Sequence, residues 1–361
     1  MDSLAWLAVY TAAWLAVTAV ARGRHGRVEV TPLAILYRLP VTLEPAGGRL
    51  RALRRAGYAS VAAAFALMAL FYYLMVAQFW ARYVARLPGA QGGGVVPLIP
   101  GVTVPLSVLP HFLVALGVAA AVHELAHAIQ ARAEGLRVRS AGIALFIFIP
   151  AAFVELDEEE LKRAPLASRL RVYSAGVAAN ILLFLALSAL AAGLPCSSLS
   201  GGVRVVGVEQ GSPAQLAGIE SGDVIVAVNG QPVHCIPELS DALERAGVKS
   251  PQPATLNVTV IRGGEALTLV IHKPANRTTI GVTIVGSFNA AGILLYSSTM
   301  LNFALALINA APLFITDGGK MLTESLDALL GGRGRLAATG LQAATVLLVV
   351  SLITIRPILP G

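Results

Sequence analysis

Charged residues are scarce in this chain: they make up 13% of its 361 residues, while 56% are hydrophobic. A soluble globular protein carries roughly 25% charged residues. The shortage excludes two ordinary soluble domains, a disordered chain and a coiled coil. Cys196 and Cys235 are the only cysteines, which is too few for a disulfide framework or a thiolate metal site. We therefore expect lipid to cover the apolar residues of an α-helical, polytopic membrane protein.

Six apolar runs are candidates for membrane helices, since a bilayer core is crossed by about 20 mostly apolar residues. They cover residues 4–20, 59–80, 106–131, 172–193, 289–311 and 336–355. The first run follows Asp2 and precedes several arginines, whereas a secretory signal peptide has its positive charge in front. We therefore expect this first run to be a retained helix and the chain to have about six spans.

The basic residues orient these spans. Residues 22–55 carry eight arginines and two glutamates, and residues 132–171 carry six arginines and one lysine. Both loops are cytoplasmic by the positive-inside rule, and attraction to anionic lipid is a second explanation of the first loop. The net charge of +7 therefore indicates a multi-pass protein of the cell membrane, and we expect no nucleic-acid partner.

Two shorter apolar segments do not fit as membrane helices. Residues 93–105 are interrupted by glycine and proline, and residues 141–154 are short and contain Pro150. Irregular backbone at membrane depth is tolerated only where protein buries it or where it lines a cavity. Either segment could therefore be a re-entrant hairpin packed against the helices.

The third apolar run contains the sequence HELAH at residues 123–127, an instance of HExxH. On a helix, His123 and His127 share a face and can bind one zinc ion, with Glu124 placed as the general base. A chance match is the alternative interpretation. However, ionisable residues inside a membrane span are costly and point to function, so we favour a metal site.

A catalytic zinc needs a third protein ligand and an open position. His111 is twelve residues from His123, about 18 Å along a helix, so we expect a carboxylate instead. Residues 309–319 read NAAPLFITDGG, and Pro312 should end the fifth span. This places Asp317 near the cytoplasmic end of that span, at the depth of the two histidines. Asp317 could instead be the N-cap of a helix over residues 318–330.

HELAH in a membrane span, with a distant N-x-x-P-x-x-x-x-D-G-G, resembles the site-2 protease family of intramembrane zinc metalloproteases. The resemblance covers about residues 106–330. It implies that one zinc ion per chain is bound by His123, His127 and Asp317, and that Glu124 is the catalytic base.

The Gly-x-x-x-Asn pattern that is typical of this family stands at residues 176–180. Asn180 and Asn309 could contact the substrate or its oxyanion, or could form hydrogen bonds between helices. Three positions depart from the family pattern: Val177 and Phe314 stand in place of proline, and Ala126 in place of glycine. These departures affect backbone shape and leave the metal ligands unchanged.

Residues 201–286 have ordinary polarity and predict a small inserted α+β domain on the non-cytoplasmic side. Residues 211–233 resemble a PDZ domain, with a short helix after GSPA and a strand that ends at an Asn-Gly turn. We further expect a helix over 237–246 and a hairpin over 254–261 and 266–273. Cys196 and Cys235 would lie on this side, paired or as buried thiols.

The insert has two candidate roles. It could bind a peptide along a sheet edge, with Ile280, Gly281 and Val282 as the loop that receives a carboxylate. It could instead exclude folded ectodomains from the active site. The sequence leaves both roles open.

The predicted organisation has four regions. They are the N-terminal helices with the basic loop (residues 1–105), the two parts of the catalytic membrane core (106–200 and 287–361) and the PDZ-like insert (201–286). The predicted partners are the lipid bilayer and other membrane proteins, whose transmembrane segments would be the substrates.

Two other classes of protein are alternatives. One is a membrane zinc protease that acts at the membrane surface, with Glu155 as third ligand. The other is not an enzyme, but a PDZ-bearing scaffold or a metal transporter. A transporter needs ionisable residues in several spans, and a scaffold does not need Glu124 between two histidines. We therefore favour an intramembrane metalloendopeptidase.

Overall fold

The computed structural model describes residues 3–40, 42–44, 50–87, 94–147 and 149–354. The chain divides into two compact units. The first comprises Met1–Ala189 and Ser297–Gly361, and the second comprises Leu190–Tyr296.

Five helices in the described part of the chain are long and apolar enough to cross a membrane. They are α2 (Arg51–Phe79, extended by the π-helix Trp80–Val84), α3 (Leu109–Ala133), α5 (Leu166–Gly193), α9 (Ala290–Ala310) and α11 (Gly332–Ser351). They lie at the second to sixth predicted spans. The first predicted span is helix α1 (Ser3–Val20), of which Ala8–Val20 counts as a shorter apolar helix. Its crossing of the membrane stays a prediction.

The helices of the first unit meet at small side chains. Val177 of α5 is fully buried in a cluster with residues of α2, α9 and the amphipathic helix α10 (Asp317–Leu330). The cluster also contains Ala64, Leu67, Ala306, Ala310 and Met321. Alanine at such crossings lets helix backbones approach closely, so polar groups on neighbouring helices come within hydrogen-bonding distance.

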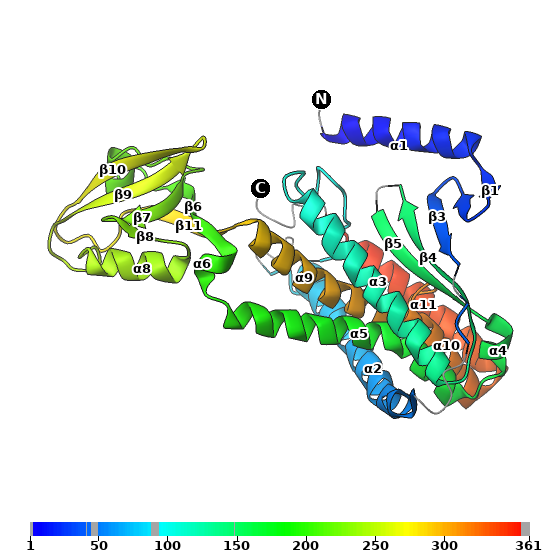
Figure 1. The fold of residues 1–361 in the computed structure, drawn as a ribbon. Coiled ribbons are helices and arrows are strands. Elements are labelled where there is room, and N and C mark those ends of the chain that lie inside the picture. Colours follow the sequence, from blue (N-terminus) through cyan, green and yellow to red (C-terminus); the bar gives the residue numbers. More distant parts are fainter. Residues whose placement is uncertain (1–2, 41, 45–49, 88–93, 148, 355–361) are drawn as a thin grey trace. The chain divides into compact units, whose positions relative to one another are not determined.

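A five-stranded antiparallel sheet lies beside α3 (Figure 1). Its strands follow the order β1 (Gly23–His25), β2 (Val28–Val30), β3 (Ala34–Leu39), β4 (Val138–Phe146) and β5 (Ile149–Leu156). Strand β5 is the edge strand next to α3. The hairpin expected at residues 141–154 is therefore the β4–β5 pair, and its depth in the membrane stays a prediction.

The other hairpin candidate, residues 93–105, begins at Gly93, which lies outside the described residues. From Gly94 onward the described part of this segment forms only isolated bridges, such as Pro100 with Val104.

After β5 comes the short helix α4 (Glu158–Arg163). Its N-cap is Asp157, whose side chain accepts hydrogen bonds from the N–H groups of Glu159 and Glu160.

The second unit is built on an antiparallel sheet with the order β10-β9-β7-β6-β11, and β8 pairs with β7. Its strands are β6 (Ser200–Val208), β7 (Val224–Val228), β8 (Gln231–Pro232), β9 (Ala254–Arg262), β10 (Glu265–Lys273) and β11 (Val282–Phe288). The helices are α6 (Cys196–Leu199), α7 (Pro213–Leu216) and α8 (Ile236–Arg245). The expected short helix, second helix and hairpin are confirmed, while β6 and β11 were not predicted. The identity of the unit as a PDZ domain stays a prediction.

Cys196 and Cys235 form a disulfide bond within this unit, which decides between the paired and the free thiols that the sequence left open.

The candidate peptide-binding loop contains Ile280 and Gly281, which precede β11, and Gly281 has a φ of 84°. Their carbonyl oxygens accept hydrogen bonds from Ala214 and Glu209. Binding of a peptide carboxylate by Ile280, Gly281 and Val282 stays a prediction.

Candidate metal centre

Three potential metal ligands converge between α3 and the start of α10. His123 and His127 lie one turn apart on α3, and both are buried. Their Nε2 atoms are 3.1 Å apart, and Oδ2 of Asp317 lies 3.1 Å from each of them. Residues separated by about 190 positions in the sequence thus form one triangle of ligand atoms.

The chemistry of this triangle fits a zinc ion. Nδ1 of His127 lies 2.8 Å from the carbonyl oxygen of Val172, which can only accept, so Nδ1 carries the proton and Nε2 presents a lone pair. Nδ1 of His123 lies 2.7 Å from Oδ1 of Asn180. Lone pairs and a carboxylate oxygen at this distance repel one another unless a proton or a metal cation lies between them. Tetrahedral ligands at about 2.0–2.1 Å from zinc are themselves about 3.3 Å apart.

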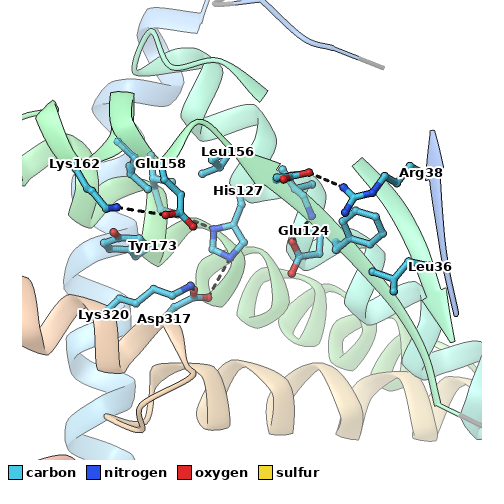
Figure 2. Close-up of a pocket in the computed structure, with 15 residues that line it drawn as sticks. Leu36, Arg38, Glu124, His127, Leu156, Glu158, Lys162, Tyr173, Asp317 and Lys320 are labelled. Carbon is cyan, nitrogen blue, oxygen red and sulfur yellow. Dashed lines mark hydrogen bonds and ion pairs between the residues drawn. The ribbon is translucent and has the colours of Figure 1, made fainter. Parts of the chain in front are cut away.

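Glu124 stands beside the triangle, and its Oε2 accepts a hydrogen bond of 3.0 Å from the backbone N–H of Val154 on β5. Glu124, His127 and Asp317 line a cavity of about 630 Å³. Figure 2 shows them around the same space, with Tyr173 and Lys320 beside Asp317. The geometry therefore combines a candidate metal site, a carboxylate beside it and a cavity.

Asp317 is free to serve as a ligand because its neighbour caps the helix. The hydroxyl of Thr316 accepts from the N–H of Gly319 at 3.2 Å and donates to the carbonyl of Ala311. The alternative role of Asp317 as N-cap is therefore wrong. A Cβ atom at Gly318 or Gly319 would overlap a carbonyl oxygen of the preceding segment, so the two glycines allow α10 to begin close to the end of α9.

The two candidate asparagines lie in different surroundings. Asn180 is fully buried behind His123, and its Nδ2 donates to the carbonyl of Ala119 at 3.1 Å and to Oδ1 of Asn302 at 2.7 Å. These are bonds between helices. Asn309, near the end of α9, is outside the set of described residues that line the cavity, and a substrate role for it stays a prediction.

Glu155, the alternative third ligand, also lies outside the triangle. Its Oε2 accepts from the hydroxyl of Ser140 and from Arg38, both at 2.6 Å. The hydrogen bond from Ser140, together with Arg38, holds the pKa of the Glu155 carboxyl below its usual value. The structure thus pairs Glu155 within the sheet, where it lines the cavity wall.

A buried ion pair joins the C-terminal end of α3 to the N-terminal part of α5. Arg171 donates to both carboxylate oxygens of Glu134, each at 2.7 Å, and the two side chains are 3% and 0% exposed. Burial alone would raise the pKa of the Glu134 carboxyl, but the hydrogen bonds from Arg171 hold it below its usual value. Gly57 of α2 packs against this pair, since a Cβ atom added at that position would lie 2.6 Å from Cδ of Arg171. Arg171 directly precedes Val172, whose carbonyl oxygen lies 2.8 Å from Nδ1 of His127.

Comparison with known proteins gives a family match and several relatives. A sequence model described as peptidase family M50 matches residues 111–353, which is more than half of the chain and includes the triangle and Glu124. Over 233 residues, the chain is 32% identical to an uncharacterised protein of Methanocaldococcus jannaschii, covering 63% of this chain and 57% of that protein.

A second relative is a membrane-bound transcription factor site-2 protease homolog of Arabidopsis thaliana, to which the chain is 32% identical over 171 residues. This match covers 46% of the chain and 33% of the relative. The chain therefore spans little more than half of the first relative and a third of the second.

Proposed function

The chain belongs to peptidase family M50, the site-2 protease family, and we propose that it is an intramembrane zinc endopeptidase. Its substrates would be other membrane proteins, cleaved within or near their transmembrane segments in regulated proteolysis. The observation that carries the proposal is the buried triangle of His123, His127 and Asp317, with sides of 3.1 Å, next to Glu124.

Zinc held by His123, His127 and Asp317 would supply a Lewis acid that activates water for attack on a peptide carbonyl. Glu124 takes the proton of the attacking water and returns it to the leaving amine. The N–H of Val154 holds one carboxylate oxygen of Glu124, which fixes the direction in which the base acts.

A substrate helix has to unwind before its backbone reaches this site, because its peptide groups are bonded within the helix. The unwound segment would then need new partners for its N–H and C=O groups in the membrane. Strand β5 is an edge strand of the described sheet and lines the cavity through Val154 and Leu156. We infer that an extended substrate segment runs along this hairpin, as peptides do at sheet edges.

The basic loops indicate how the chain would be oriented in the membrane. Arg132 and Arg137 flank the end of α3 that carries His127 and would lie in the cytoplasm. The active site would then face the cytoplasm and the insert the opposite side, with the four regions divided as the sequence predicts. The insert would bind a peptide of the substrate or exclude folded ectodomains.

The test is Glu124→Gln in the full chain, reconstituted in lipid with single-span membrane proteins as candidate substrates. We expect cleavage to fall by about 10²–10⁴-fold, the usual contribution of a general base, with unchanged zinc content by elemental analysis. Glu159→Gln, at an exposed glutamate of α4, is the matched control and should cleave normally. Cleavage by Glu124→Gln at the wild-type rate would exclude Glu124 as the base.

A further inference from the structure

We propose that Asn302 is a positioning residue that sets the tautomer of His123 through Asn180. The inference rests on the proposed zinc site and adds a residue on α9 that contacts neither the triangle nor the cavity. The three side chains form a continuous buried path. Asn302 Oδ1 lies 2.7 Å from Nδ2 of Asn180, and Oδ1 of Asn180 lies 2.7 Å from Nδ1 of His123.

The orientation of the Asn302 amide is fixed by a group that can only accept. Its Nδ2 donates to the backbone carbonyl of Ser298 at 2.8 Å. If the amide were flipped, its oxygen would face that carbonyl oxygen, and two acceptors would meet without a proton. Oδ1 of Asn302 must therefore face Asn180.

The orientation of Asn180 follows from the same reasoning. Its Nδ2 lies between the carbonyl of Ala119, at 3.1 Å, and Oδ1 of Asn302, at 2.7 Å. Both are acceptors, so the NH₂ group has to point toward them, and Oδ1 has to point toward His123. That oxygen can only accept, so Nδ1 of His123 carries the proton and Nε2 presents its lone pair to the triangle.

Burial makes this path specific. Asn180 and Asn302 are 0% and 1% exposed, so water does not readily replace a missing partner. Without the oxygen of Asn302, the Asn180 amide keeps one acceptor and loses part of the preference for its present orientation. In the flipped orientation it would donate to Nδ1 of His123. The proton would then sit on Nε2, the atom that faces Asp317, and that tautomer cannot bind metal there.

The test is the zinc affinity of the purified full chain in detergent micelles, measured by competition with a chromophoric chelator. We expect Asn302→Leu to weaken zinc binding by about 10- to 100-fold, as outer hydrogen-bond partners of metal ligands do. Ser298→Ala keeps the carbonyl that Asn302 uses and should bind zinc as the wild type does. Unchanged affinity of Asn302→Leu would overturn the inference and leave the proposed function standing. Absence of zinc binding by the wild type would overturn the proposed function itself.

A double-mutant cycle separates positioning from packing. In an Asn180→Ala background, the amide that joins Asn302 to His123 is absent, so Asn302 can no longer act on the tautomer of His123. We expect Asn302→Leu to change the zinc affinity by less than about threefold there, against 10- to 100-fold in the wild-type background. Equal losses in the two backgrounds, including loss through misfolding in both, would show that Asn302 only packs and would overturn the inference.

Discussion

At the scale of single residues, the metal centre depends on a position without a side chain. Gly176 lies on α5 and faces the two histidines of α3. A Cβ atom there would lie 2.5 Å from Cε1 of His123 and 2.6 Å from Nε2 of His127. This glycine has a helical φ, so the side chain that would enter the triangle, and not backbone strain, explains the requirement for glycine.

We predict that Gly176→Ala lowers zinc affinity at least about tenfold, in the range reported for disturbed ligand shells, because the methyl group displaces the Nε2 atoms. Helix propensity alone would favour alanine by about 1 kcal/mol, so the loss would be a local effect. Gly193→Ala is the control on the same helix, since a Cβ there meets nothing within 4 Å in the described part of the chain. Chelator competition measures both variants, and equal affinities would contradict the prediction.

The sequence predicted the residues of the triangle because each of its two parts has a local sequence pattern. HExxH places two histidines on one helix face, and the D-G-G sequence follows a helix-ending proline. Asn302 and the carbonyl of Val172 were missed because they act through hydrogen bonds over long sequence separations, such as 122 residues between Asn180 and Asn302. No spacing rule in a single sequence predicts such contacts.

At the scale of elements, the position of the proposed base depends on a strand as well as on its own helix. Glu124 is positioned by α3, but one of its oxygens is held by β5 at Val154. The long helices were predicted because apolar runs determine them, although α2 and α5 begin eight and six residues before the predicted spans at 59–80 and 172–193. Strands β1 and β2 were not predicted, since three-residue segments such as Gly23–His25 and Val28–Val30 are too short to establish a strand pattern.

We predict that Val154→Pro lowers the turnover number about tenfold or more, with zinc content unchanged. Proline removes the N–H that holds Glu124, and an edge strand tolerates proline where its N–H points away from the neighbouring strand. A charge-assisted hydrogen bond contributes about 1.5–3 kcal/mol. Its loss would therefore reduce the turnover number about tenfold or more. Val154→Ala changes the side chain, keeps the N–H and serves as the control. A normal rate for Val154→Pro in the reconstituted assay would mean that α3 alone positions the base.

At the scale of the whole molecule, the two parts of the membrane core are separated in sequence by a unit with its own core. Val203, Ile225, Leu239 and Val258 are buried in the cluster of that unit. The ends of the insert are paired, because Ser200 of β6 lies opposite Phe288 of β11. The N–H of Asn289 also donates to the carbonyl of Leu199 at 3.1 Å. The insert therefore leaves and rejoins the membrane core at neighbouring residues.

This pairing predicts that the insert is dispensable for the metal centre. The variant replaces residues 201–287 by a glycine-serine turn of about two to four residues, the length that joins antiparallel neighbours. We expect its zinc affinity to stay within about threefold of the wild type. The reason is that the ligands and their hydrogen-bond partners lie outside the insert. Chelator competition on the shortened chain measures this, and loss of zinc binding would show that the core needs the insert to fold.

The same variant distinguishes the two roles of the insert. Faster cleavage only of substrates with folded ectodomains indicates a size filter, and slower cleavage of all substrates indicates peptide binding.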